Sequence, residues 1–77
     1  MNDLNNLKNM IGEQFNNDNI VCVMIDKNDA VIVSDTSITS NFEGYGTCNL
    51  YNCYYDNEDS SIYDIWVDDN NIIVDVN

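Results

Sequence analysis

Electrical charge is the feature that most constrains how this 77-residue chain can fold. Fourteen carboxylates face two lysines, and without arginine or histidine the formal net charge is −12. A net charge of roughly 2–8 is enough to keep a small domain in solution, and charge of one sign destabilises the compact state by self-repulsion. A small domain this acidic therefore either meets a cationic partner or tolerates the repulsion for another reason.

Composition nevertheless predicts a folded chain. Hydrophobic residues make up 44% of the sequence, unlike an acidic disordered tail. The length suits one domain near the small end of those that fold alone, so we expect a single domain spanning residues 1–77. The longest apolar run, Ile20–Ile25, is far shorter than the ~20 residues of a membrane span. The first residues lack the basic and apolar regions of a secretory signal, so we expect a cytoplasmic protein.

The spacing of apolar residues predicts one helix followed by about five strands. Apolar side chains recur every three or four residues from Leu4 to Phe15, which is typical of one amphipathic helix capped by Asn2 or Asp3. Strands are predicted at Ile20–Ile25, Ala30–Val33, Thr47–Tyr55, Ile62–Val67 and Ile72–Val76, with a loop at Ser34–Gly46. The order predicts an α+β fold, in which the N-terminal helix packs on a curved antiparallel sheet.

Two hairpins follow from this pattern. The first would pair Ile25 with Ala30 and is apolar on both faces, so the later strands must curl over its second face, or a second protomer or a partner must cover it. The second, with a two-residue turn at Asp69-Asn70, would set Asp64 directly opposite Asp75. Like charges directly opposite each other destabilise a strand pair. Such a pair therefore suggests that the carboxylates serve a purpose other than stability.

Half of the acids lie between Asp56 and Asp75. Most are aspartates, whose short side chains hold the carboxylate close to the backbone, as a rigid row of phosphate-like charges would require. Trp66 is predicted on the same strand face as Asp64 and Asp75, and tryptophan often concentrates binding energy at interfaces. The candidate partner-binding residues are Asp56, Glu58, Asp59, Asp64, Trp66, Asp68, Asp69 and Asp75. The alternatives are that the acids only solvate the surface and that Trp66 is buried in the core.

Several kinds of chemistry are disfavoured. Without histidine there is no histidine base or metal ligand, and with two lysines and no arginine the chain is not expected to bind nucleic acid directly. The acidic turns do not fit the EF-hand calcium pattern. Cys48 and Cys53 are five residues apart and would lie on opposite faces of a strand, so no disulfide is expected between them, and Cys22 is expected in the core. We therefore expect neither an enzyme nor a cofactor or metal.

In size, charge, Asp/Asn richness and helix-plus-sheet order, the whole chain resembles the small acidic inhibitors that phages and mobile elements encode. Specifically, it is similar to anti-CRISPR proteins that mimic DNA. The resemblance implies expression inside a bacterial cell and binding to the basic groove of a Cas effector. There, carboxylates would pair with arginines that read the PAM and exclude the target duplex. Inhibition would need occupancy alone.

Other functions fit the same composition. A basic nuclease could also be bound and inhibited by an acidic protein of another class, namely an immunity protein, an antitoxin or an anti-restriction protein. A phage structural or assembly module that oligomerises through the second sheet face belongs to a different class, and its acidity would serve only solubility. For the inhibitor we expect a monomer or a homodimer and no membrane partner.

Overall fold

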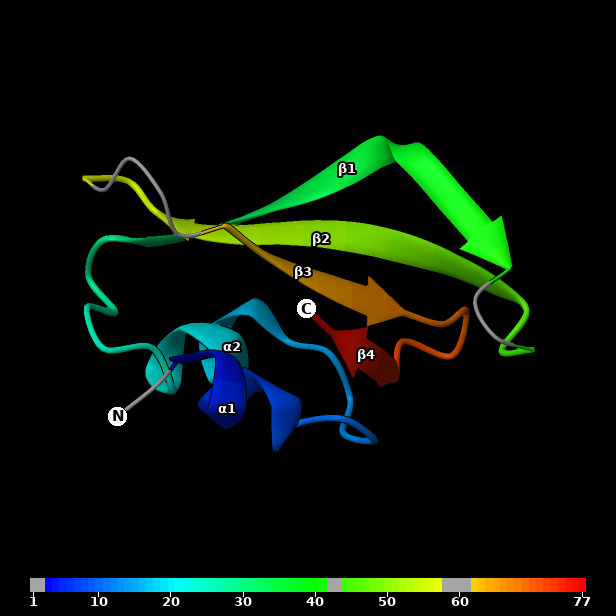
Figure 1. Cartoon of the computed structure of the whole chain (residues 1–77), viewed down its shortest axis with the longest axis horizontal. Coiled ribbons are helices and arrows are strands. Elements are labelled where there is room, and N and C mark those ends of the chain that lie inside the picture. The colour runs from blue at the N-terminus through cyan, green and yellow to red at the C-terminus, as the bar shows by residue number, and fades with distance from the viewer. Residues whose placement is uncertain (1–2, 42–43, 58–61) are drawn as a thin grey trace.

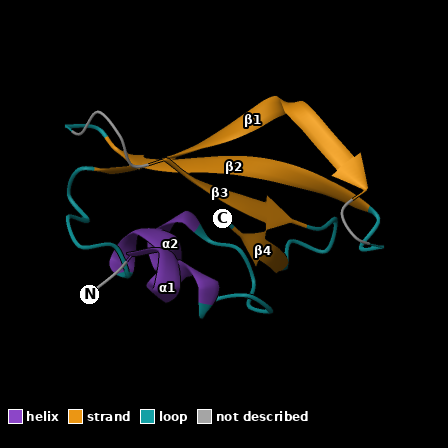
Figure 2. Ribbon diagram, viewed as in Figure 1, coloured by secondary structure: helices purple, strands orange, loops and turns teal. Residues whose placement is uncertain are grey.

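The computed structural model describes residues 3–41, 44–57 and 62–77, and it confirms the α+β fold (Figure 1). The elements are α1 (Asp3–Lys8), α2 (Asn17–Cys22), β1 (Ala30–Asn41), β2 (Thr47–Tyr55), β3 (Ile62–Val67) and β4 (Ile73–Val76). The strands form one antiparallel sheet in the order β1-β2-β3-β4, four strands rather than the predicted five. Both helices lie on one side of the sheet, below it in Figure 2. No helix in the described part of the chain is long and apolar enough to cross a bilayer.

The predicted N-terminal helix is about half as long as expected. It ends at Lys8, and Gly12 has a φ of 94°, which lies in the left-handed region that glycine adopts at no steric cost. Beyond it the chain runs along β4, where the Gly12 N–H donates to the Ile73 carbonyl at 2.8 Å and the Ile73 N–H donates to the Glu13 carbonyl at 3.0 Å. These bonds replace the helical ones, so the predicted helix from Leu4 to Phe15 is wrong in its second half.

The predicted strand at Ile20–Ile25 is wrong, because this segment contains α2 instead. The Asn16 side chain caps the helix by accepting from the Asp18 N–H at 2.9 Å. Ile20 and Met24, four residues apart, are buried, whereas Ile25 is exposed. A short apolar run fits a buried helical turn as well as a strand, and here the cap decides. The predicted pairing of Ile25 with Ala30 therefore does not form.

Strand β1 extends through much of the segment that was predicted to be a loop. It pairs with β2 from Ala30↔Tyr55 to Asp35↔Leu50 and resumes at Thr39↔Asn49. Residues 36–38 are extra on the β1 side and form the bend visible in Figure 1. Asp35 stabilises the bend, because its carboxylate accepts from the Ser37 hydroxyl at 2.6 Å and from the Ser37 N–H at 3.1 Å.

The second hairpin has a different register from the predicted one. Trp66 lies opposite Asp75, and Asp64 lies opposite Asn52 on one side and exchanges two 2.9 Å backbone hydrogen bonds with Asn77 on the other. The predicted pairing of Asp64 with Asp75 is therefore wrong. Two features cause the change. The turn spans three residues, because the Asp68 carboxylate accepts from the N–H groups at 70 and 72, each at 2.9 Å, and the register shifts between Trp66 and Val67, so that Val74 is an extra residue on β4. The like-charge penalty inferred from the sequence does not arise.

Asn71 completes this turn with a φ of 66°. We expect Asn71→Val to lower the free energy of unfolding by about 1–2 kcal/mol, because a β-branched residue is strained in the left-handed region. Asn71→Gly should change it by less than about 0.5 kcal/mol, since glycine adopts this φ freely. Urea unfolding monitored by circular dichroism measures both. Equal destabilisation by the two substitutions would show that the lost side-chain bond to the Phe15 carbonyl matters more than the backbone.

The core lies between the helices and one face of the sheet. Leu7 from α1 and Ile20 from α2 pack with Cys53, Ile65 and Val76 from the strands. One carboxylate is buried beside this core. Its residue, Asp3, is 4% exposed and lies in the first turn of α1 rather than outside it as a cap.

Asp3 joins three parts of the chain through hydrogen bonds. The Tyr55 hydroxyl on β2 donates to its carboxylate, and the Ile25 N–H donates to the same carboxylate at 3.0 Å. The Asp26 N–H in turn donates to the Tyr55 hydroxyl oxygen at 3.1 Å. The network therefore holds α1 against the segment after α2 and the end of β2.

Two buried groups beside Asp3 make stability depend on alkaline pH. Burial raises the pKa of the Cys53 thiol to about 12, and the negative charge of Asp3 adds to the effect. Burial and the hydrogen bond to Asp3 together raise the pKa of Tyr55 to about 12. Both groups stay neutral in the folded chain at a pH where the unfolded chain has lost their protons. Their contribution is therefore complete below about pH 9 and is lost as the pH rises toward about 12.

We therefore expect the melting temperature to fall steadily above about pH 9. The Tyr55→Phe variant lacks one of the two titrating groups, so its melting temperature should fall less steeply with pH. Below about pH 9 its melting temperature should already be lower than that of the wild-type chain, because the hydroxyl's hydrogen bonds are lost. Thermal unfolding of both proteins across this range, followed by circular dichroism, measures the two slopes. Identical slopes would contradict the assignment to Tyr55.

Candidate protein-binding face

The sheet has one face covered by the helices and one that they leave uncovered, which we call the open face. Successive side chains of a strand point to opposite faces, and directly paired residues share a face. Cys53, Ile65 and Val67 pack against the helices, so their neighbours along β2 and β3 belong to the open face. The open-face residues are Val31, Val33 and Asp35 of β1, Cys48, Leu50, Asn52 and Tyr54 of β2, Ile62, Asp64 and Trp66 of β3, and Asp75 of β4.

Among the residues of the described strands, three carboxylates belong to the open face, one each from β1, β3 and β4. Asp35, Leu50, Trp66 and Asp75 form one row across the sheet, so the two aspartates are roughly 14 Å apart at a strand spacing of about 4.8 Å. Asp64 lies two residues before Trp66, which places it roughly 8 Å from Asp75. All three aspartates are half-buried, so their carboxylates stay close to the sheet.

One of these carboxylates is held ionised by its neighbours. The Ser37 hydroxyl and backbone N–H donate to Asp35 and lower the pKa of its carboxyl. Hydrogen bonds to the charged form favour that form. Asp35 therefore presents a fixed negative charge on the β1 side of the open face.

Apolar side chains lie between the acids. Ile62 is 67% exposed and Val33 is 46% exposed, and Tyr54 lies between their strands on β2. Trp66 is half-buried in the row between Leu50 and Asp75, whereas Leu50 and Cys48 on the same face are buried. The face thus combines an aromatic side chain, exposed aliphatic surface and carboxylates.

The structure brings together only some of the predicted site residues. Asp64, Trp66 and Asp75 share the open face, as predicted. Glu58 and Asp59 lie outside the described residues. Asp35 was missed, because its segment read as a polar loop; the β-branched residues at 36, 38 and 39 were the available signal of a strand.

The other predicted acids lie at the two ends of the sheet. Asp68 and Asp69 are in the β3–β4 turn, where the Asp68 carboxylate is engaged by backbone N–H groups and Asp69 is exposed. Asp56 is at the opposite end of β3, roughly 20 Å away along a six-residue strand. These acids therefore do not form one row with the open face.

A separate acidic cluster surrounds Asp56. Its N–H donates to the Asp29 carbonyl at 2.8 Å, and the Asn57 side chain donates to the Asp29 carboxylate at 2.9 Å. A hydrogen bond and repulsion from the neighbouring Asp26 carboxyl raise the pKa of Asp29. Within the described residues no group of three or more histidine, cysteine, aspartate or glutamate side chains is arranged to hold a metal ion.

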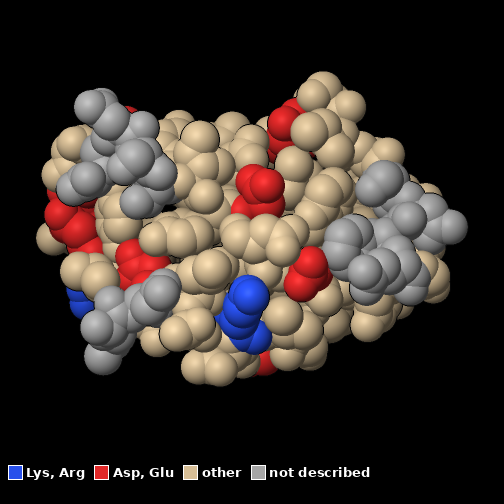
Figure 3. All heavy atoms as spheres, viewed as in Figure 1, with Lys and Arg blue, Asp and Glu red and all other residues tan. Residues whose placement is uncertain are grey.

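Charge on the rest of the surface is dispersed. Figure 3 shows acidic side chains scattered across the visible face with basic side chains among them, rather than gathered in one patch. Net charge alone therefore does not select a binding surface. The open face differs because its acids accompany exposed apolar side chains on rigid strands.

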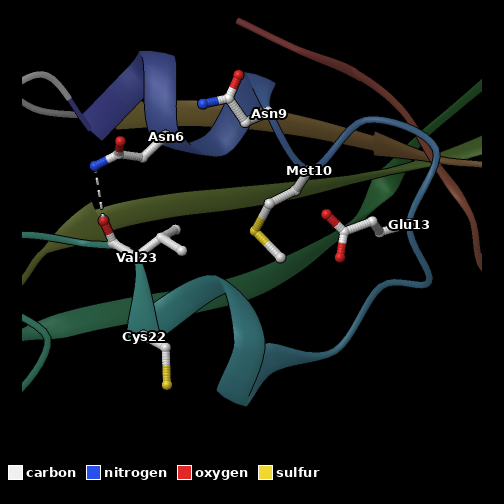
Figure 4. Close-up of a pocket in the computed structure, with 6 residues that line it drawn as sticks. All are labelled: Asn6, Asn9, Met10, Glu13, Cys22 and Val23. Atoms are coloured by element: carbon white, nitrogen blue, oxygen red, sulfur yellow. Dashed lines mark hydrogen bonds between the residues drawn. The ribbon is translucent and has the colours of Figure 1, made fainter.

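A shallow groove lies between the helices (Figure 4). It has a volume of about 450 Å³ and is lined by Asn6, Asn9, Met10, Glu13, Cys22 and Val23. The Asn6 amide donates to the Val23 carbonyl at 3.1 Å and so joins α1 to the end of α2. Cys22 is exposed here, so its predicted place in the core is wrong, whereas Cys48 and Cys53 are buried. The groove holds one carboxylate, from Glu13, and one thiol, with no base positioned between them.

Comparison with protein-family models, with curated protein sequences and with solved structures finds no match to this chain. No relative therefore assigns a role to any of its residues.

Proposed function

We propose that this protein is an acidic inhibitor that binds the nucleic-acid groove of a basic protein through its open face. Its similarity in size and charge to anti-CRISPR proteins makes a Cas effector the first target to test. The observation that carries the proposal is the grouping of Asp35, Asp64 and Asp75 with Trp66 on the sheet face that the helices do not cover. Antiparallel strands fix the spacing of these side chains before binding, so little entropy is lost when the partner is engaged.

The mechanism is occupancy. Duplex DNA carries dense phosphate charge across grooves about 6–12 Å wide, and carboxylates roughly 8–14 Å apart present negative charge on a similar scale. A lysine- and arginine-lined channel would attract a −12 protein over a long range and speed its association. Trp66 would stack against an arginine of the channel. The duplex is then excluded without any bond being made or broken.

The test is affinity capture from a bacterial lysate, with the wild-type chain and a variant of the open face as parallel baits. We expect a basic nuclease or Cas effector to be retained at low salt, released by added duplex DNA, and absent from the Asp64→Lys, Asp75→Lys bait. Purified target should then lose DNA binding as the inhibitor is titrated. Retention that neither DNA nor the double variant affects would reject the proposal. The identity of the captured enzyme separates an anti-CRISPR protein from an immunity or anti-restriction protein.

A second candidate is an oligomeric assembly module, and the exposed Val33 and Ile62 side chains favour it. Copies would then associate through the open face. Size-exclusion chromatography with light scattering at low and high salt discriminates the two functions. A defined oligomer that persists and strengthens in high salt would favour assembly, whereas a monomer or dimer whose partner binding is lost in high salt would favour the inhibitor.

A further inference from the structure

The two edges of the sheet differ in how they are covered. Beside β4, the segment 12–15 occupies the outer edge, where the Phe15 N–H donates to the Asn71 carbonyl at 2.7 Å and the Gly12 N–H donates to the Ile73 carbonyl. Strand β1 is the other edge, and no described segment pairs with its outer side (Figure 1). Uncovered edges are the usual templates for added strands.

The backbone groups that face outward can be assigned from one hydrogen bond. The Asp56 N–H donates to the Asp29 carbonyl, so these two residues form a hydrogen-bonded antiparallel pair. Hydrogen-bonded pairs recur at every second residue, which directs the backbone groups of Val31, Val33 and Asp35 toward β2. The N–H and C=O groups of Ala30, Ile32 and Ser34 therefore point away from the sheet. They offer three donors and three acceptors to an added strand.

The side chains along this edge are bracketed by acids. Asp29, Val31, Val33 and Asp35 alternate with the outward-facing backbone positions and lie on one side, so two aliphatic residues sit between two carboxylates. The edge carries none of the lysines or prolines that commonly protect such strands. The bulge at 36–38 ends the regular segment, which limits an added strand to about seven residues.

A second copy of this chain is a poor occupant. Two copies of the edge, paired antiparallel so that Ile32 faces Ile32, would overlap fully and exchange the outward backbone groups. That register sets Asp29 of each copy opposite Asp35 of the other. Like charges directly opposite destabilise a strand pair, and each chain already carries −12. The carboxylates of Asp29 and Asp35 therefore favour a partner strand that has a basic residue at each end.

We propose that the outer edge of β1 binds an extended segment of the partner protein by strand addition. The partner positions opposite Asp29 and Asp35 require Lys or Arg, and those opposite Val31 and Val33 require apolar residues. One residue separates each of these positions from the next. The pattern is basic-x-apolar-x-apolar-x-basic, and it is the same for parallel and antiparallel addition. This inference deepens the proposed function, on which it rests for the basic nature of the partner.

A peptide titration of the full chain tests the proposal directly. The probe is Lys-Thr-Val-Thr-Ile-Thr-Lys with blocked termini, and the matched control replaces both lysines with glutamate. Amide NMR spectra should show saturable shifts and slowed hydrogen exchange at Ala30, Ile32 and Ser34. The glutamate peptide should bind the wild-type chain at least about tenfold more weakly than the lysine peptide does. The lysine peptide should bind the Asp35→Lys variant more weakly than the wild-type chain by at least the same factor.

Ser34→Pro supplies a second variant that keeps the fold intact. Its N–H faces outward, so proline removes one donor without breaking the ladder to β2, and unchanged spectra for β3 and β4 confirm folding. We expect this variant to lose the peptide. Equal binding of the two peptides, or shifts confined to open-face residues such as Trp66, would overturn the proposal, as would concentration-dependent dimerisation through β1 in the absence of peptide.

Two experimental outcomes distinguish a failure of the proposed function from a failure of strand addition. If Ser34→Pro still captures a basic nuclease that DNA releases, the open face is sufficient and strand addition is rejected. If the peptide binds the β1 edge as expected but DNA and the open-face variant leave the captured partner unaffected, strand addition stands and the DNA-mimic function is rejected.

Discussion

The double variant Asp64→Lys, Asp75→Lys is expected to bind its target about 100-fold more weakly than the wild-type chain. Each substitution removes one attractive charge from the open face and puts a repulsive one in its place. The two residues come from β3 and β4 and lie roughly 8 Å apart, so one basic groove would meet both. The dissociation constant, measured by calorimetry against the captured target at low and high salt, should differ most between variant and wild type at low salt.

The control must carry the same change in net charge without touching the open face. Glu13→Lys, Asp18→Lys fits, because both residues are exposed and lie in the N-terminal helical region before β1. Asp3 does not fit, since its carboxylate is buried. We expect the control to slow association modestly through the lower net charge and to leave the dissociation rate unchanged. If the control weakens binding as much as the open-face variant does, net charge alone drives the interaction and the site is wrongly placed.

Asp3→Ala should lower the free energy of unfolding by about 3 kcal/mol, a large part of the 5–15 kcal/mol typical of a small domain. The substitution leaves the Tyr55 hydroxyl and the Ile25 N–H without the acceptor that the Asp3 carboxylate provides. The Asp3 side chain is almost fully buried. An unsatisfied buried donor costs about 1–3 kcal/mol. Chemical denaturation with urea measures the change.

Two further variants locate the source of that loss. Asp18→Ala alters an exposed carboxylate on α2 and should change stability by less than about 0.5 kcal/mol. Tyr55→Phe removes the hydroxyl, so Asp3→Ala made in that background should cost less than it does alone. Additive effects in this cycle would show that Asp3 and Tyr55 act independently.

The parts of the fold that could be predicted are those with long, regular patterns. Strands β2 and β3 begin and end at the predicted residues, and both combine β-branched or aromatic residues with clear turn signals on either side. The helical start of the chain was also predictable from its apolar spacing. Its end was not, because the backbone at Gly12 and Glu13 finds hydrogen-bond partners on β4, which is about sixty residues away in the chain.

Local polar side chains account for the other differences. Asn16 turns the apolar run at Ile20–Ile25 into a helix, and Asp68 makes a three-residue turn out of a predicted two-residue one. A change in turn length shifts every residue of the hairpin relative to its neighbour. The added turn residue alone would put Asp64 and Asp75 on opposite faces, and the extra residue at Val74 returns them to one face, as predicted, without setting them opposite each other.

By itself, the sequence determined the acidity of this protein, its α+β class and the strands that carry Asp64 and Trp66, because composition and periodicity are properties of the chain alone. Tertiary structure decided which acids share a face, which edge of the sheet stays uncovered, and that Asp35 belongs with Asp75. These choices depend on register and on hydrogen bonds between segments distant in the chain, and such bonds form only after the strands have met.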